Sequence, residues 1–226
     1  ISLGLVGSEM CIRDRFKSYH TYFVNKKEKA LLEEFCFGVK ANSKNCAGAK
    51  LNADIVGKPA TWIAEQAGFT VPEGTNILAA ECKEVGENEP LTREKLSPVI
   101  AVLKSESRED GIAKARQMVE FNGLGHSAAI HTADEELTKE FGKAVKAIRV
   151  ICNSPSTFGG IGDVYNAFLP SLTLGCGSYG RNSVGDNVSA CLLYTSDAAD
   201  DLTRFDYRGS RTIKKKKKTK QKHTKH

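Results

Sequence analysis

The chain has 226 residues, a formal net charge of +6 and a hydrophobic content of 40%. This length is enough for one well-buried core, and no apolar run approaches the roughly 18 residues that a membrane span needs. Of the seven cysteines, the five outside the two terminal segments form an odd set without Cys-x-x-Cys spacing, which argues against a disulfide framework or a zinc site and for a reducing cytoplasm.

The positive charge is concentrated at the C-terminal end. Of the 33 basic and 27 acidic residues, residues 191–226 hold 11 and 4, and residues 1–15 hold two of each. Residues 16–190 therefore keep 20 basic and 21 acidic residues, a net charge of −1. This central part offers no electrostatic case for binding nucleic acid or a membrane surface.

The two ends share a coding feature. Residues 10–14, Met-Cys-Ile-Arg-Asp, can be encoded by ATGTGTATAAGAGAC. The reverse complement of that string, with one T in front, translates to Cys-Leu-Leu-Tyr-Thr, which stands at residues 191–195. This DNA resembles a transposon end used as a sequencing-library adapter, and the lysines at 214–218 can be an A-rich run read as codons.

The alternatives for the ends are a secretory signal and a basic arm for nucleic acid. The first seven residues are apolar but lack a basic start and a small-residue cleavage site. We therefore treat residues 1–15 and 191–226 as adapter-like segments, the second with a Lys-rich disordered tail. We exclude both from the fold and expect them to pack on nothing.

Short apolar runs alternate with helical patterns between residues 16 and 152, and no internal repeat is visible. Residues 16–20 look like the remnant of a helix. A short β-like run follows, and four later runs have the length and composition of buried strands. In chain order these runs are residues 22–24, 77–82, 99–103, 127–131 and 148–152.

Helices are predicted between these runs from their end signals. Asn25 and Glu28 have the spacing of a capping box, and Gly38 ends that helix. Pro59 suits the first turn of the next helix, which Gly68 ends.

Two further helices complete the pattern. Ser107 and Thr132 each stand three residues before an acidic residue, as in a capping box, and predict helices that end near Phe121 and Lys146. Strands alternating with helices predict βαβ units and a mostly parallel sheet, so we expect an α/β fold. The glycines around Leu124 follow a helix and lead into a strand, which does not fit the dinucleotide-binding G-x-G-x-x-G.

Two loops have the composition of functional segments. Residues 84–96 are polar and acidic, a type of loop that often carries function. Residues 153–187 are rich in glycine, which is used where the backbone needs a positive φ or approaches a ligand closely. Because this stretch keeps many apolar residues, we interpret it as an ordered loop system lining a cleft rather than as a linker.

The glycine-rich stretch also carries a family resemblance. NSPSTFGGIGDVYN followed by PSLTLGCGSYGRNS resembles the end of the aldehyde dehydrogenase domain of bifunctional aldehyde–alcohol dehydrogenases. These CoA-acylating enzymes reduce acetyl-CoA to acetaldehyde and then to ethanol. The resemblance runs from about Phe16 to Ala190 and implies the C-terminal part of an aldehyde dehydrogenase catalytic domain, with a mostly parallel sheet flanked by helices.

The resemblance also implies cofactors and partners. We expect NAD as the cofactor, coenzyme A as a cosubstrate, a small-molecule substrate and a homo-oligomer in the cytoplasm. Iron is expected only in the alcohol dehydrogenase domain. In the family, the acyl-forming cysteine and the dinucleotide-binding domain lie upstream of the segment that resembles residues 16–20, so we expect this chain to be inactive by itself.

Glu94 is the first candidate site residue. It opens Glu94-Lys95-Leu96-Ser97-Pro98, which matches the family's E-x-x-x-P-type motif, and the family's glutamate lies on the nicotinamide ribose. A carboxylate can accept hydrogen bonds from both ribose hydroxyls. The alternative is one more solvated acid in an acidic loop.

His126 is the second candidate, as an acid, base or hydrogen-bond donor at the end of the family's GxGH pattern. A structural histidine is its alternative. His131, inside a predicted strand, is expected to be a packed core histidine. Cys176 lies between two glycines but has no visible base, so we do not expect it to be the nucleophile.

The remaining expectations concern three further cysteines, a metal site and the alternative functions. We expect Cys36, Cys82 and Cys152 in the core, and no metal site. Two alternative functions stay open: a piece of a monofunctional aldehyde dehydrogenase, and a non-enzymatic α/β binding module with a basic arm.

Overall fold

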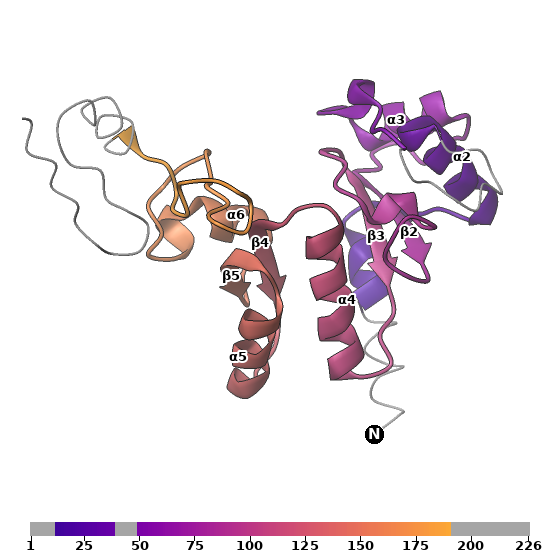
Figure 1. Cartoon of the computed structure of the whole chain (residues 1–226). Coiled ribbons are helices and arrows are strands. Elements are labelled where there is room, and N and C mark those ends of the chain that lie inside the picture. Colours follow the sequence, from indigo (N-terminus) through magenta and orange to yellow (C-terminus); the bar gives the residue numbers. More distant parts are fainter. Residues whose placement is uncertain (1–11, 39–48, 191–226) are drawn as a thin grey trace, which may run out of the picture.

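The computed structural model describes residues 12–38 and 49–190 (Figure 1). Residues 12–18 are helical, and thirteen further elements follow in the described part of the chain. They are β1 (Thr21–Phe23), α2 (Lys26–Phe37), η1 (Ala53–Ile55), α3 (Ala60–Ala67), β2 (Ile77–Cys82), η2 (Pro90–Thr92), β3 (Val99–Leu103), α4 (Arg108–Phe121), β4 (Gly125–Ile130), α5 (Glu135–Ala144), β5 (Ala147–Cys152), α6 (Ser156–Ile161) and η3 (Asp163–Tyr165).

All strand pairs within the described residues are parallel, so the predicted α/β class is confirmed. One sheet has the order β1-β2-β3, with Thr21 opposite Ile77 and Leu78 opposite Val99. The other pairs β4 with β5. The sequence predicted the strands but not that they divide between two sheets, because a strand pattern does not say which strands become neighbours.

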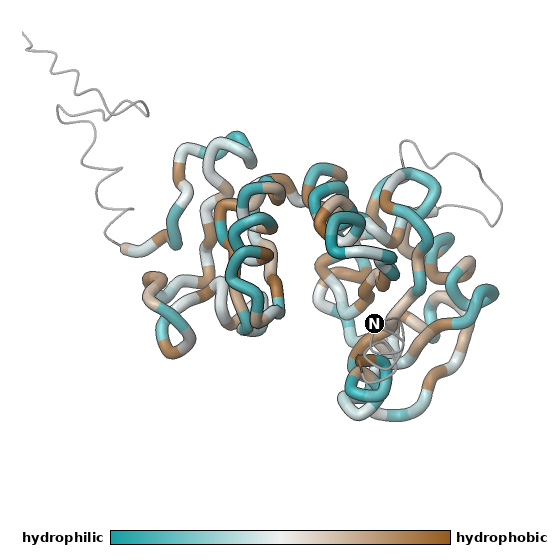
Figure 2. Tube along the Cα trace, turned by 90° about the horizontal axis from the view of Figure 1, so that it is seen from below, coloured by the Kyte–Doolittle hydropathy of each residue, from teal (hydrophilic) through white to brown (hydrophobic). Residues whose placement is uncertain are grey.

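The two sheets lie in different parts of the molecule. Figure 1 shows α2 and α3 beside the first sheet, α5 and α6 beside the second, and α4 between the two sheets. Figure 2 shows the same two parts from below, joined by the connection that leads from α4 to β4. None of the helices in the described part of the chain is long and apolar enough to cross a membrane.

The predicted ends of α2 and α3 are confirmed. The Asn25 side chain accepts from the backbone N–H groups of Lys27 and Glu28 at 2.9 and 3.0 Å, and the Glu28 carboxylate accepts from the Asn25 N–H at 2.8 Å. This is a complete capping box. Gly38 and Gly68 then end their helices with φ values of 66° and 92°, in the left-handed region that glycine adopts at low cost.

The predicted start of α5 is wrong. Its N-cap is Asp134, whose carboxylate accepts from the N–H groups of Glu136 and Leu137 at 3.0 and 3.1 Å. Thr132 instead accepts from the Asp134 N–H at 3.1 Å, just outside the helix. An aspartate cap also places negative charge at the positive end of the helix dipole, so it outcompetes a threonine two residues earlier.

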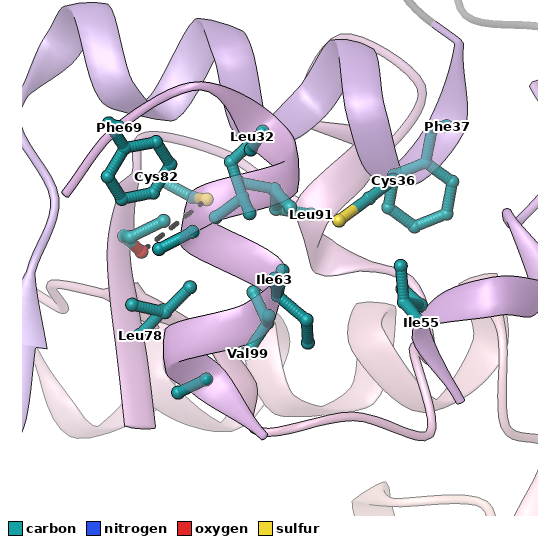
Figure 3. Close-up of a cluster of buried hydrophobic side chains, with 14 residues drawn as sticks. Leu32, Cys36, Phe37, Ile55, Ile63, Phe69, Leu78, Cys82, Leu91 and Val99 are labelled. Atoms are coloured by element: carbon teal, nitrogen blue, oxygen red, sulfur yellow. Dashed lines mark hydrogen bonds between the residues drawn. The ribbon is translucent and has the colours of Figure 1, made fainter. Parts of the chain in front are cut away.

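The main apolar core lies between the first sheet and the helices α2 and α3. Figure 3 shows Leu32, Ile63 and Leu78 meeting there, all with 0% of their surface exposed. Leu91 joins them from η2, so the loop that precedes β3 is part of this core. The two thiols of Cys36 and Cys82 lie in the same cluster.

The expectation that residues 1–15 pack on nothing is wrong for Arg13. The Arg13 guanidinium lies 4.8 Å from the centre of the Phe23 ring and forms an ion pair with Glu81. A cation over an aromatic face is attracted by the ring quadrupole, which gives this residue a partner on β1. Residues 1–11 and 191–226 lie outside the described residues.

Candidate functional site

Glu94 lies on the segment that connects β2 to β3. Its side chain is exposed, and among the described residues it takes part in no hydrogen bond or ion pair. The next strand, β3, begins five residues later at Val99. A carboxylate in this state is free to accept hydrogen bonds from a ligand.

The segment that carries Glu94 is folded tightly. Pro90, Leu91 and Thr92 form a buried 3-10 turn, and the Thr92 hydroxyl donates to the Glu89 carbonyl at 2.7 Å. The Glu89 carboxylate accepts from the Lys83 N–H at 3.2 Å. These bonds make an ordered loop out of a stretch whose polar composition predicted only a loop.

A partly buried ion cluster ties this loop to α2. The Lys29 ammonium pairs with the Glu89 carboxylate and donates to the Glu81 carbonyl at 2.9 Å. Glu33 lies 3.8 Å from the same ammonium, and burial raises the pKa of its carboxyl. The loop is therefore attached to the helix by charge as well as by the apolar contacts of Leu91.

Arg93, the residue before Glu94, is also fixed. Its guanidinium donates to the Ala49 carbonyl at 2.7 Å and lies 5.0 Å from the centre of the Phe121 ring on α4. Glu94 is thus exposed next to an anchored side chain. This arrangement suits a group that must be presented to a ligand in one direction.

His126 is exposed at the second position of β4. The ring nitrogen Nδ1 lies 3.0 Å from the Ser127 hydroxyl, and the backbone N–H of His126 donates to the Gly123 carbonyl at 3.2 Å. Gly125 before it has φ 89°, and a Cβ there would lie 2.3 Å from the Cys176 carbonyl oxygen. Only glycine permits this close approach, so the backbone that leads to His126 is pressed against the glycine-rich stretch.

The sequence reasoning missed the buried group that organises this region. Arg149 on β5 is 3% exposed and donates to the carbonyls of Gly175 and Gly185 at 2.7 and 3.0 Å. Its Nε donates to the Asn187 side chain at 2.8 Å, and a longer bond of 3.5 Å reaches the His126 carbonyl. Burial lowers the pKa of this guanidinium.

Asn187 extends the same network. Its amide donates to the carbonyls of Gly160 and Leu169 at 2.9 and 2.7 Å. Arg149 and Asn187 together therefore donate to four backbone carbonyls of the glycine-rich stretch, and Arg149 attaches this network to β5. The signal in the sequence was a single arginine inside an apolar run, and its partner lies 38 residues away.

The glycine-rich stretch forms an open pocket of about 400 Å³. Its lining residues are Ile161, Gly162, Asp163, Val164, Pro170, Ser171 and Leu172. Neither Glu94 nor His126 lines this pocket, and no hydrogen bond among the described residues joins the two. The predicted loop system is thus ordered, and the two candidate site residues lie on different parts of the fold.

The described cysteines are all free thiols. Cys36 and Cys82 are buried as predicted, and burial raises the pKa of each to about 12, which keeps them protonated and unreactive. The prediction for Cys152 is wrong, because it ends β5 with an exposed side chain. Cys176 is half-buried.

The prediction for His131 is wrong for a related reason. His131 lies directly after β4, which ends at Ile130, and its side chain is exposed. An end of a strand leaves the sheet, so its last side chains need not be covered. Among the described residues, no group of three His, Cys, Asp or Glu side chains could hold a metal ion.

Comparisons with known proteins point to one family. The chain is 99% identical over 178 residues to the aldehyde-alcohol dehydrogenase of Streptococcus pneumoniae serotype 4, a match that covers 79% of this chain and 20% of that protein. This segment belongs to the aldehyde–alcohol dehydrogenase family. The chain spans about a fifth of the length of this curated relative.

More distant relatives agree with this family. The bifunctional aldehyde-alcohol dehydrogenase of Escherichia coli (strain K12) is 42% identical over 181 residues, which cover 78% of this chain and 19% of that protein. Among solved structures, an acetylating aldehyde dehydrogenase from Geobacillus thermoglucosidasius superposes with a TM-score of 0.71 at 31% identity, covering 95% of this chain and 42% of that chain. No protein-family model matches the chain.

Proposed function

We propose that residues 16–190 form the C-terminal part of the aldehyde dehydrogenase domain of a bifunctional aldehyde–alcohol dehydrogenase. The whole enzyme would convert acetyl-CoA and NADH to acetaldehyde, CoA and NAD. Its NADH supplies the hydride when bound. The 99% identity over 178 residues and the α/β fold support the assignment.

The part of the reaction that these residues serve is cofactor binding. Glu94 supports this role because it is exposed and unpaired among the described residues, while the loop around it is bonded to α2 and to Ala49. In this role its carboxylate accepts hydrogen bonds from the two hydroxyls of the nicotinamide ribose. A loop that is already rigid loses little entropy when the cofactor binds.

His126 is proposed as an acid, base or hydrogen-bond donor toward the substrate. Its exposure at the start of β4 and its fixed backbone support this role. Residues 1–15 and 191–226 are proposed to be adapter-derived. Iron in the alcohol dehydrogenase domain, a homo-oligomer, a cytoplasmic location and inactivity of this chain by itself all stay predictions.

The experiment is Glu94→Gln in the full-length enzyme that carries this segment. The change keeps the shape but removes the charge and replaces one acceptor with a donor. Charge-assisted hydrogen bonds are worth roughly 1.5–3 kcal/mol, so cofactor binding or hydride transfer should fall about ten- to a hundredfold. Steady-state kinetics with NADH varied would measure this.

Glu87→Gln is the matched control, because Glu87 is another exposed acid of the same segment. It should leave the kinetics unchanged, and neither variant should lose more than roughly 0.5 kcal/mol of stability, as is usual for surface changes. An unchanged rate with a large drop in melting temperature for Glu94→Gln would show that Glu94 holds the loop together instead.

The alternative is a piece of a monofunctional aldehyde dehydrogenase. The succinate-semialdehyde dehydrogenase (acetylating) of Clostridium kluyveri is 39% identical over 140 residues, which cover 62% of this chain and 31% of that protein, so the chain is similar to an acetylating aldehyde dehydrogenase as well as to aldehyde-alcohol dehydrogenases. Reading the genomic locus beyond the codon of Ala190 in an uncontaminated clone separates them. A coding sequence that continues into an alcohol dehydrogenase domain supports the bifunctional enzyme, and a stop codon shortly after supports the alternative.

A further inference from the structure

Lys95 is buried directly beside the exposed Glu94. Only 8% of its surface is accessible, and its ammonium donates to the backbone carbonyls of Leu91 and Arg93, the second bond being 2.7 Å long. Both acceptors belong to the short turn that leads into Glu94. Within the described part of the chain no carboxylate forms an ion pair with this ammonium.

A lysine in this position is costly for the fold. Burying an ammonium without a paired carboxylate carries a large desolvation cost unless hydrogen bonds compensate for it. The titratable groups that act on it are the Cys36 thiol on α2, the Cys82 thiol on β2 and the Glu94 carboxylate, and burial lowers its pKa to about 8. An apolar side chain of similar length would avoid this cost but would leave the two carbonyls without a donor.

The backbone on both sides of Glu94 is consequently fixed. On one side, the ammonium closes the turn onto the carbonyls of Leu91 and Arg93. On the other side, Leu96 has φ 49° and its carbonyl accepts from the Gly57 N–H at 3.2 Å. Between these two points the backbone of Glu94 is held, so its Cα–Cβ bond leaves the loop in a fixed direction and only the side-chain torsions stay free.

We propose that Lys95 is a positioning residue for the cofactor, one that acts by fixing the direction of the Glu94 carboxylate. This inference rests on the proposed ribose contact of Glu94. Lys95 itself does not touch the cofactor, because it is buried and both observed hydrogen bonds of its ammonium end on the protein backbone. Its effect on cofactor affinity therefore depends on Glu94.

A double-mutant cycle in the full-length enzyme tests this dependence. The variants are Lys95→Met, Glu94→Gln and the double variant, with Lys83→Met as a control for loss of an exposed lysine on the same segment. The charged hydrogen bond proposed between Glu94 and the ribose is worth roughly a factor of ten in binding. Because Lys95→Met would misplace Glu94 and weaken this bond, it should raise the KM for NADH about tenfold. The KM for acetyl-CoA should stay unchanged, and Lys83→Met should change neither.

The decisive measurement is Lys95→Met in the Glu94→Gln background. In that background the turn positions a glutamine that no longer binds the ribose normally. Lys95→Met should therefore raise the KM for NADH by less than about twofold further. The same tenfold loss in both backgrounds would overturn the positioning role while leaving Glu94 as the ribose ligand. No effect of Glu94→Gln itself would overturn the proposed function and this inference with it.

A thermal melt of each variant checks that it is still folded. If Lys95→Met does not fold, Lys95→Gln is taken through the same cycle, since its amide keeps a donor at the buried position. Coupling to Glu94→Gln in the KM for NADH then supports the inference. Losses that simply add in both KM values count against it.

Discussion

The two parts of the molecule are held together by different physical interactions. The part with β1, β2 and β3 contains an apolar cluster of fourteen buried residues. Among the described residues, the part with β4 and β5 buries far fewer apolar side chains, namely Phe141, Val145, Ala147 and Ile151, and α4 contributes none. In that part, the hydrogen bonds of Arg149 and Asn187 and the close packing of glycines hold the chain segments together.

The difference shows what each kind of interaction can specify. Apolar burial is large but has no direction, so it fixes the packing of α2 and α3 without fixing each backbone angle. Hydrogen bonds from Arg149 are directional, and they end on the carbonyls of Gly175 and Gly185. A Cβ at Gly175 would lie 2.2 Å from the Val184 carbonyl oxygen, so these segments approach more closely than side chains allow.

The largest expected effect is in the apolar part. Leu32 is 0% exposed, so Leu32→Ala should lower the free energy of unfolding of the 226-residue chain by about 2–5 kcal/mol through lost burial and the cavity left behind. Leu31→Ala is the matched control, because the neighbouring leucine is 38% exposed. Urea denaturation measures both. Equal effects of the two changes would mean that the cluster is not the stabilising core.

A smaller effect, confined to the other part, is expected for Asn187→Ala. The change removes the donors to Gly160 and Leu169 and the acceptor for Arg149, and a buried polar group without a partner costs about 1–3 kcal/mol. The amides of Gly175 and Gly177, which donate to Asp186 and Val184, should exchange faster with solvent.

The control for this change is Asn122→Ala, at an exposed asparagine that ends α4. It should cost no more than roughly 0.5 kcal/mol. If Asn187→Ala speeds exchange in β2 as much as in the glycine-rich stretch, the two parts unfold as one cooperative unit. The two parts would then differ in how their residues pack, but not in their stability toward unfolding.

Much of the fold could be predicted because its signals are local. The capping box of Asn25 and Glu28 lies within four residues, and Gly38 stands next to the helix that it ends. Local signals fail where two caps compete, as Thr132 and Asp134 do, and at strand ends, where Cys152 is exposed.

The candidate site was predicted less completely because its organisation is not local. Glu94 and His126 were found from a family motif, and their roles stay predictions. The buried state of Lys95 depends on carbonyls of a turn whose geometry no spacing rule gives. Arg149 depends on an asparagine 38 residues away, and only the folded chain brings the two together.

The smallest expected effect is a pH dependence in the apolar part, and Lys95 causes it. Burial lowers its pKa to about 8 from an ordinary value of 10.5. Above pH 8 the folded chain releases this proton, whereas the unfolded chain keeps it up to about pH 10.5. The unfolded state therefore binds more protons in this window, so the contribution of Lys95 to stability rises with pH.

The thiols of Cys36 and Cys82 act in the opposite direction. Their pKa is raised from 9.0 to about 12, so above pH 9 the unfolded chain loses protons that the folded chain keeps, and stability falls. The Lys95→Met variant keeps both thiols. The Lys95 charge also acts on the Cys36 thiol, so the difference in unfolding free energy between the original chain and this variant reports the lysine up to about pH 9, where the thiols begin to titrate in the unfolded chain.

This difference should shift in favour of the original chain by roughly 1 kcal/mol between pH 7 and pH 9, since one pKa unit corresponds to about 1.4 kcal/mol and only part of the shift is realised in that range. Urea denaturation of both proteins at constant ionic strength measures it. A difference that stays flat would mean that Lys95 titrates normally and is reached by water. A difference that falls with pH would mean that the charged ammonium is stabilised by its two carbonyl acceptors more than burial disfavours it, and the fixed turn beside Glu94 would then be held by the charge itself.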